Sequence, residues 1–245
     1  GEVGLIAAED TRTARKLLSA HGLRARFTSF HEHNKKTKLP YLLKVLETED
    51  LALVSEAGTP GISDPGYELV VAAIERGITI VPIPGPSIVL SALSVSGLPT
   101  DQFVFLGFLP RRKGDRQKLF RSVAQDERTL VAFEAPHRVK ATLADLLDTL
   151  GDRRLAACRE MTKLHEEVFR GTVSQALAHF AEPRGEFTLV VAGKPEEAAP
   201  SLTPNVETEL RRLKKAGVPA REALGQLTGA TGLSRRELYK LWLKL

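Results

Sequence analysis

Short apolar runs alternate with amphipathic stretches from the beginning of the chain. The pattern predicts strands over residues 3–8, 26–30, 51–55 and 78–82, and helices after residue 10 and over 39–46, 67–76 and 86–96. Few polar residues interrupt these strands, which is typical of a mainly parallel sheet with helices on both faces. The first part of the chain therefore predicts a domain with β-α-β-α order.

A polar, turn-forming segment at 97–102 (GLPTDQ) separates this pattern from a second one. Beyond it the sequence predicts strands over 103–108, 129–134, 155–161, 167–171 and 187–192, and helices over 111–124, 138–150 and 174–180. Sequential strands such as those within 155–171 are expected to pair antiparallel, so this half predicts a mixed α/β domain. We expect a domain boundary at 97–102.

The last part of the chain differs in composition and hydrophobic pattern from both preceding parts. Residues 194–204 (KPEEAAPSLTP) predict a linker, and three short helices are predicted over 205–216, 219–228 and 234–245. Ser234 and Glu237 have the spacing of a capping box. The predicted fold class is α/β, with two α/β domains over 1–100 and 101–193, the linker over 194–204, and a basic helical module over 205–245.

The composition indicates a globular protein without a membrane-spanning helix. Of 245 residues, 42% are hydrophobic and 27% charged, as in ordinary globular proteins, and no apolar run reaches the roughly 18 residues of a membrane span. No membrane partner is expected.

The single cysteine, Cys158, excludes an intrachain disulfide and a thiolate zinc site, which indicates a reducing, cytoplasmic location. Met161 is the only methionine, and no signal peptide is predicted, so the natural start is expected to be removed or truncated.

The net charge of +5 lies entirely in the tail. Residues 1–200 carry 26 basic and 26 acidic side chains, whereas residues 201–245 carry nine basic and four acidic ones. A basic module attracts polyanions such as RNA or DNA. Two interpretations stay open for it: a helix-turn-helix-like nucleic-acid module, or a small bundle packed on the body with a solvated face.

Two loops have the residues of a ligand crevice. Residues 55–66 (SEAGTPGISDPG) contain three Gly and two Pro between a predicted strand and a helix, and Glu56 and Asp64 could accept hydrogen bonds from a ribose or an amino group. Residues 83–87 (IPGPS) again join a strand end to a helix. Ligands bind beyond the carboxyl ends of such strands, so the two loops predict one crevice. Neither matches a phosphate-binding GxxxxGK[ST] loop or a GxGxxG fingerprint.

Three further segments concentrate polar side chains. Residues 134–138 (EAPHR) and 159–167 (REMTKLHEE) contain His137, Lys163 and His165 as candidate proton carriers. Residues 30–38 (FHEHNKKTK) predict a basic loop that touches phosphate. None of these segments has the ligand spacing of a zinc site, so no metal is predicted.

Taken in order, the segments LIAAEDTR, FHEHN, SEAGTPGISDPGY, IPGPS with ALSVSGLP, FEAPHR, EMTKLHEE and GEFTLVVAG resemble the bacterial ribosomal RNA small subunit methyltransferase I family, within the tetrapyrrole methylase superfamily. The resemblance runs over residues 3–193. It implies two α/β domains with S-adenosylmethionine in the cleft between them, and methyl transfer to the ribose 2′-hydroxyl of a cytidine in the decoding region of 16S rRNA. It also implies a homodimer that acts on rRNA within the 30S subunit.

The resemblance assigns residues to the cofactor. The implied cofactor-binding residues are Ser55, Glu56, Ala57, Gly58, Thr59, Ser63, Asp64, Pro84, Gly85, Ser87 and Ala135. Family members usually have Asp at the position of Glu56, which keeps the carboxylate one methylene further out. Similar proteins also begin with another strand, a loop containing Pro and Gly, and a helix, so one wall of the cleft is expected to be missing and cofactor binding to be weak.

Methyl transfer to a hydroxyl requires a group that accepts its proton or stabilises the developing oxyanion, and Lys163 and Glu134 are our candidates. Residues expected to contact RNA phosphates are Lys35, Lys36, Arg111, Arg112, Lys113, Arg116 and Arg138. Two alternatives stay open: a methyltransferase for a small tetrapyrrole, and a non-catalytic RNA-binding or ribosome-assembly protein.

Overall fold

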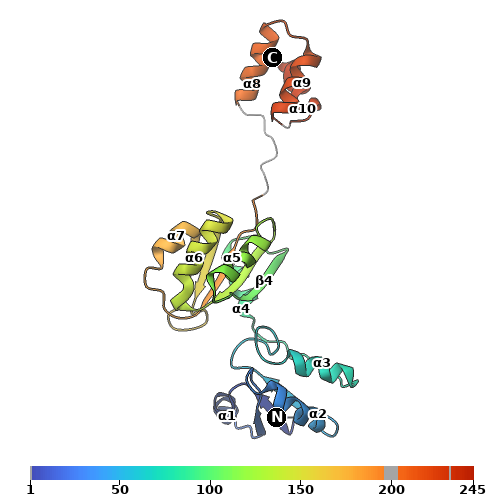
Figure 1. The fold of residues 1–245 in the computed structure, drawn as a ribbon, viewed down its shortest axis with the longest axis vertical. Helices are drawn as coiled ribbons and strands as arrows, with labels where there is room; N and C mark the ends of the chain where they lie inside the picture. Colours follow the sequence, from blue (N-terminus) through green and yellow to red (C-terminus); the bar gives the residue numbers. More distant parts are fainter. Residues whose placement is uncertain (1, 196–203, 232) are drawn as a thin grey trace. The chain divides into compact units, whose positions relative to one another are not determined.

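The computed structural model describes residues 2–195, 204–231 and 233–245. The chain forms two compact units, Gly1–Lys194 and Pro195–Leu245, and the order of their elements can be followed in Figure 1. Most of the linker predicted over 194–204 lies outside the described residues.

The first sheet contains three parallel strands in the order β2-β1-β3. Its strands are β1 (Leu5–Ala8), β2 (Arg26–Ser29) and β3 (Leu51–Val54), and its helices are α1 (Thr11–Ala20), α2 (Lys35–Val45) and α3 (Tyr67–Glu75). Asp10 caps α1 by accepting a hydrogen bond from the backbone N–H of Arg12. Phe30, Leu42 and Leu69 pack against β1 to form the core of this sheet. The predicted parallel order is confirmed.

The predicted strand over 78–82 is wrong. This segment lies between α3 and α4 (Ile88–Ser96) without regular structure, and it exposes Ile80 by 42% and Val81 by 71%. Its apolar composition matches a buried strand, but a strand also needs a neighbour for its backbone hydrogen bonds. Among the described residues, no strand pairs with this segment.

The second sheet contains five strands in the order β4-β5-β8-β6-β7. Its strands are β4 (Phe103–Phe108), β5 (Thr129–Glu134), β6 (Arg154–Arg159), β7 (Glu167–Thr172) and β8 (Phe187–Val191), and its helices include α5 (Lys113–Ser122), α6 (Pro136–Leu150) and α7 (Val173–His179). β4 and β5 are parallel, whereas β8 is antiparallel to both β5 and β6, and β6 is antiparallel to β7. The mixed sheet predicted for this half is confirmed.

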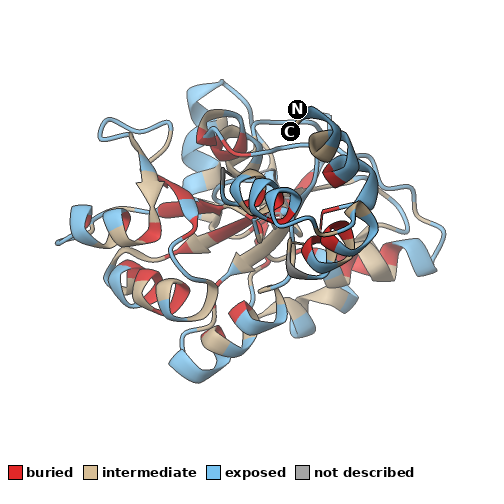
Figure 2. Ribbon diagram, turned by 90° about the horizontal axis from the view of Figure 1, so that it is seen from above, coloured by how far each residue is buried: buried red, intermediate tan, exposed pale blue. Residues whose placement is uncertain are grey.

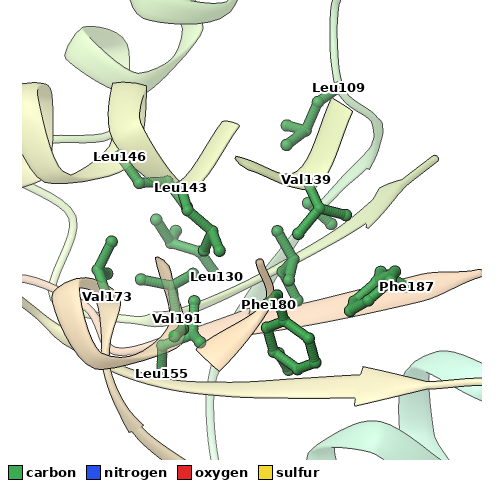
Figure 3. Close-up of a cluster of buried hydrophobic side chains, with 14 of the residues drawn as sticks. Leu109, Leu130, Val139, Leu143, Leu146, Leu155, Val173, Phe180, Phe187 and Val191 are labelled. Atoms are coloured by element: carbon green, nitrogen blue, oxygen red, sulfur yellow. The ribbon is translucent and has the colours of Figure 1, made fainter. Parts of the chain in front are cut away.

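Alternate residues of the central strands point to opposite faces, and each face has its own core. Leu130, Leu155 and Val191 face α6 and α7 in the cluster drawn in Figure 3. Val131, Ala156 and Cys158 face Ala92 and Leu93 of α4. Figure 2 shows the resulting pattern, with buried residues on the strands and on the helix faces, and exposed ones in the connecting loops.

The packing of α4 corrects one assignment. The sequence places this helix in the first α/β domain, ahead of a boundary at 97–102. In the structure its apolar side chains, Ala92 and Leu93, pack on the second sheet instead. Periodicity identifies the face that a helix buries, but it does not identify the sheet that covers that face.

The second unit is a three-helix bundle of α8 (Pro204–Lys215), α9 (Ala220–Thr231) and α10 (Arg235–Lys244). Leu210, Leu224 and Leu238 are central to its core. Ser234 and Glu237 form the predicted capping box, because each side chain accepts a hydrogen bond from the other residue's backbone N–H. None of the helices among the described residues has the length and apolar content needed to span a membrane.

Candidate functional site

The loop over 55–66 is held compact by its glycines. Gly58, Gly61, Ser63 and Gly66 all have positive φ, which is costly for any residue except glycine. A Cβ at Gly66 would lie 2.8 Å from Leu53 Cδ2 and 2.9 Å from the backbone nitrogen of Gly61, so only glycine fits there. Ser63 is the one non-glycine residue of this loop in the left-handed region, and such strain concentrates at functional sites.

Three carboxylates come together where β1 and β3 end. Glu9 follows β1, and its Oε2 accepts a hydrogen bond of 3.2 Å from the backbone N–H of Glu56, which follows β3. Asp64 lies close enough to both for their charges to act on it. Parallel strands bring these residues to the same edge, as predicted for Glu56 and Asp64. Glu9 was not assigned to the site from the sequence, because an acidic pair after a strand looks the same when it only begins a helix, as Asp10 does for α1.

The pKa of Asp64 is raised above its ordinary value of 3.8. Partial burial is the main cause, and the negative charges of Glu9 and Glu56 add to it. A hydrogen bond from Ser55 opposes the rise. Burial and the neighbouring carboxylates both disfavour the ionised form of Asp64, and a cationic group beside it would favour that form.

The loop over 84–87 is open. Pro84, Gly85 and Ser87 lie in the segment without regular structure that leads into α4, and no atom lies within 4 Å of the position of a Cβ on Gly85. Ser87 begins α4 without a hydrogen bond from its side chain to the helix end. We still predict that this loop and residues 55–64 line one crevice.

A bulge in β4 contacts the first loop. The register of β4 against β5 shifts between Phe105 and Phe108, and Gly107 at the shift has a φ of 64°. The position of a Cβ on Gly107 lies 3.2 Å from Ser63 Oγ. Bulges are frequent beside active sites because they let a strand approach another segment closely.

One edge of the second sheet collects the polar segments of that half. β4, β5 and β6 run in the same direction, so the residues that follow them lie along this edge. These are the segment after Phe108, the segment 134–138, and the loop 160–166. The segments EAPHR and REMTKLHEE, which are separate in sequence, thus reach the same edge.

Glu134 does not face a substrate. Its side chain is fully buried, and its carboxylate accepts hydrogen bonds from the backbone N–H of Ala135 and the hydroxyl of Thr142, together with an ion pair from Arg138 at 2.5 Å. Arg138 also donates to the carbonyl of Leu109. The predictions that Glu134 is catalytic and that Arg138 binds RNA are therefore wrong, because the two side chains neutralise each other inside the protein.

Lys163 is exposed and engaged in two ion pairs. Its ammonium pairs with Glu186 at 2.7 Å and Glu160 at 3.0 Å, and these carboxylates raise its pKa above the ordinary value. A lysine general base needs a lowered pKa, so these ion pairs favour a role as a cation that orients the substrate over a role as base. Glu160 and Thr162 of the same loop have positive φ, which marks a second strained segment.

Some of the side chains predicted to contact RNA are exposed, whereas others form ion pairs with acidic side chains of the protein. Those exposed are Lys36, Arg111, Arg112 and Lys113, of which Lys113 also lies 3.8 Å from Asp145 Oδ1. Arg116 is buried and pairs with Asp145, and its guanidinium also donates to the carbonyls of Pro110 and Arg111. Lys35 pairs with Glu32 and Glu68. Arg116 is therefore wrong as a phosphate contact, and the charge of Lys35 is already neutralised.

His31 and His33 lie beside each other, with ring centroids 6.0 Å apart. Within the described ranges, no group of three His, Cys, Asp or Glu side chains is arranged to hold a metal ion.

Comparison with known proteins assigns the family. The model of the tetrapyrrole (corrin/porphyrin) methylases matches residues 1–177. A Synechocystis protein named ribosomal RNA small subunit methyltransferase I is 49% identical over 99% of this chain and 89% of its own length. The chain belongs to the ribosomal RNA small subunit methyltransferase I family of tetrapyrrole methylases. The resemblance found in the sequence is confirmed.

Other relatives agree with this family, and two solved structures have the same fold. Proteins with the same name from Halalkalibacterium halodurans and Thermotoga maritima are 43% and 47% identical, over 98% and 79% of this chain and 86% and 88% of their own lengths. The methyltransferase CobJ has a TM-score of 0.58 at 18% identity, covering 82% of this chain and 86% of its own. Diphthine synthase has a TM-score of 0.59 at 14% identity, covering 79% and 80%. These structures confirm the fold class.

Proposed function

We propose that the chain transfers the methyl group of S-adenosylmethionine to the ribose 2′-hydroxyl of a cytidine in the decoding region of 16S rRNA. The observation that carries this proposal is the 49% identity, over 99% of the chain, to a protein named ribosomal RNA small subunit methyltransferase I. We further propose that the protein works in the cytoplasm as a homodimer, on rRNA within the 30S subunit.

The loop after β3 has the chemistry that S-adenosylmethionine requires. The cofactor carries a sulfonium and an ammonium group besides its ribose hydroxyls, and the carboxylates of Glu9, Glu56 and Asp64 complement both kinds of group. The open position beside Gly85 leaves room for close approach to the main chain. We therefore assign cofactor binding to these two loops and to Ala135, as the sequence predicts, and add Glu9 to them.

When bound, S-adenosylmethionine supplies a methyl carbon activated by the neighbouring positive sulfur. The main task of the chain is to hold the 2′-oxygen in line with that carbon at near-attack distance. The bound cofactor would supply this carbon to the 2′-oxygen and keep the sulfur as its own neutral thioether, and a side chain of the protein would accept the hydroxyl proton. We assign this base to His137 or His165, which are exposed in segments at the same sheet edge. Lys163 stays protonated and can orient the oxygen.

The test is methyl transfer from labelled S-adenosylmethionine to assembled 30S subunits and to naked 16S rRNA, followed by mapping of the modified ribose. We expect a single 2′-O-methylated cytidine in the decoding region. Transfer to a small tetrapyrrole and to neither form of the RNA would contradict the proposal. Saturable binding of RNA without binding of S-adenosylmethionine would favour an assembly protein instead.

Replacing Asp64 with asparagine is expected to weaken S-adenosylmethionine binding by roughly tenfold, because a hydrogen bond to a charged acceptor is lost. The same change should stabilise the protein at pH 7. The raised pKa means that Asp64 holds its proton more tightly in the folded state than in the unfolded state, where the pKa is 3.8. As the pH rises above 3.8, ionisation of Asp64 therefore lowers the free energy of unfolding. Calorimetry with the cofactor and thermal melts at several pH values measure both effects.

The gain in stability from Asp64→Asn should be less than about 1 kcal/mol, because a partly solvated carboxylate is screened, and it should vanish towards pH 4. Asp101→Asn is the matched control, since Asp101 is exposed in the turn before β4. We expect neither effect for this control. Unchanged cofactor affinity in Asp64→Asn would remove Asp64 from the binding site.

A further inference from the structure

The last helix of the chain has two contrasting faces. Leu238 is fully buried, and Leu241, Trp242 and Leu245 pack against the core of the three-helix bundle. The opposite face, which we call the α10 basic face, consists of six exposed residues: Arg235, Arg236, Tyr239, Lys240, Leu243 and Lys244. At 100° per residue these six fall within one half of the helix circumference. The basic residues are therefore gathered on one surface.

The acids of the described helical bundle form no ion pair with this face. Glu207 pairs with Arg211 and Glu209 with Arg212, both within α8, while Glu237 is used in the capping box of α10. No acidic side chain among the described residues lies within 4 Å of the four cations of the α10 basic face, although Glu237 is near enough to Lys240 for the two charges to act on each other. Most of the charge is thus available to an external anion.

Helix stability explains Lys244, which lies in the last turn of α10, but it does not explain Arg235 and Arg236. Arg235 and Arg236 lie in the first turn of α10, where the helix dipole disfavours positive charge. The cations in the last turn of α8, by contrast, are placed where the dipole favours them. Tyr239 is 48% exposed and Leu243 65% exposed between the cations. Tyr239 thus offers an aromatic ring for stacking beside the charges.

We propose that the α10 basic face binds RNA, with its cations on backbone phosphates and Tyr239 stacked on a base or ribose. Cations combined with an aromatic ring are the recurring arrangement for binding unpaired nucleic acid. This inference rests on the proposed function, in which the substrate is RNA. The family model covers residues 1–177, so the α10 basic face would be an RNA contact outside the part of the chain that it matches. A second contact on the same chain raises the effective concentration of substrate for the first unit.

The test uses the full chain and compares two triple variants of equal charge. Arg235→Gln/Arg236→Gln/Lys240→Gln removes three cations of the α10 basic face, and Arg211→Gln/Arg212→Gln/Lys215→Gln removes three from α8. Affinity for a 16S rRNA decoding-region fragment is measured over a series of salt concentrations. We expect the first variant to reduce the salt slope by about 2 to 3 and the affinity roughly 100-fold near 0.1 M salt, while the control stays close to the parent protein.

Melting curves separate this effect from unfolding. Neutralising Arg235 and Arg236 removes an unfavourable interaction with the helix dipole, so the melting temperature of the first variant should not fall. Tyr239→Ala supplies an independent signature: affinity should drop about fivefold or more with an unchanged salt slope, because stacking involves no counterion release. Equal slopes in the two triple variants would overturn the inference.

The inference and the proposed function can fail separately. If the parent protein transfers no methyl group but the first variant still loses RNA affinity, the α10 basic face stands and the proposed activity fails. If the parent protein methylates rRNA and the first variant binds RNA with the parent slope, the inference fails. Vesicles containing phosphatidylserine test the competing partner: loss of vesicle binding with unchanged RNA affinity would overturn the inference in favour of a membrane surface.

Discussion

Replacing Gly66 with alanine is expected to lower kcat/KM for methyl transfer by roughly 100-fold, because misplacing reacting groups by about 1 Å has effects of that size. The new Cβ would lie 2.8 Å from Leu53 Cδ2 and 2.9 Å from the backbone nitrogen of Gly61, and the φ of 150° is itself unfavourable for alanine. The backbone of Gly61 cannot rotate away as a flexible side chain would. The loop that carries Glu56 and Asp64 must therefore shift as a whole.

Gly77→Ala is the matched control for this prediction. Gly77 also has a positive φ, 68°, but no atom lies within 4 Å of the position of its Cβ. It should cost about 1 to 2 kcal/mol of stability through its backbone conformation and leave kcat/KM almost unchanged. Steady-state kinetics and calorimetry with S-adenosylmethionine compare the two variants. Parent-like cofactor affinity in Gly66→Ala would mean that this loop does not form the cofactor site.

Replacing Arg116 with methionine is expected to lower the free energy of unfolding of the first unit by about 3 kcal/mol, the low end of the cost of removing one charge of a buried pair, because Gln117 and Lys113 still lie 3.1 and 3.8 Å from Asp145 Oδ1. The side chains of Arg116 and Asp145 are only 4% and 3% exposed. Nε of Arg116 lies 2.9 Å from Asp145 Oδ2. The carbonyls of Pro110 and Arg111 also lose a donor, so the segment that carries Arg111 and Arg112 should loosen.

Two comparisons test this explanation by chemical denaturation. Arg128→Met breaks an ion pair with Asp126 in which Arg128 is 49% exposed, and we expect a loss below about 1 kcal/mol. The double variant Arg116→Met/Asp145→Leu removes both buried charges and should recover most of the stability lost in the single variant. If the double variant is as unstable as the sum of the two single variants, the loss comes from packing rather than from the unpaired charge.

Most of the fold could be predicted from the sequence because its elements have strong local signals. β5 was predicted with the bounds that the structure has, and the capping box at Ser234 was identified from two residues. The errors concern long-range pairing. Residues 78–82 have the composition of a strand without a partner, and α4 has an amphipathic face that covers a different sheet. A segment's own sequence encodes neither the strand it pairs with nor the sheet it covers.

The sequence identified two loops as the candidate site, and their role in cofactor binding stays a prediction. Gly58 and Asp64 are assigned to it because a glycine-rich connection at a strand end lets the main chain approach a ligand and because a carboxylate can accept its hydrogen bonds. The roles of Glu134 and Arg116 were wrong because a charged residue in a polar segment looks the same whether its partner is a substrate or a buried counter-ion. Pairing between residues 29 positions apart, as in Arg116 and Asp145, has no sequence signature.

The single thiol of the chain offers a natural reporter of how the first unit opens. Cys158 is 1% exposed between α4 and the second sheet, and burial raises its pKa to about 11. Because only the exposed thiolate reacts with alkylating reagents, labelling must wait until this sheet separates from α4. The rate of alkylation under native conditions therefore times that separation without an introduced probe, and the helical bundle, which has no cysteine, contributes nothing to the signal.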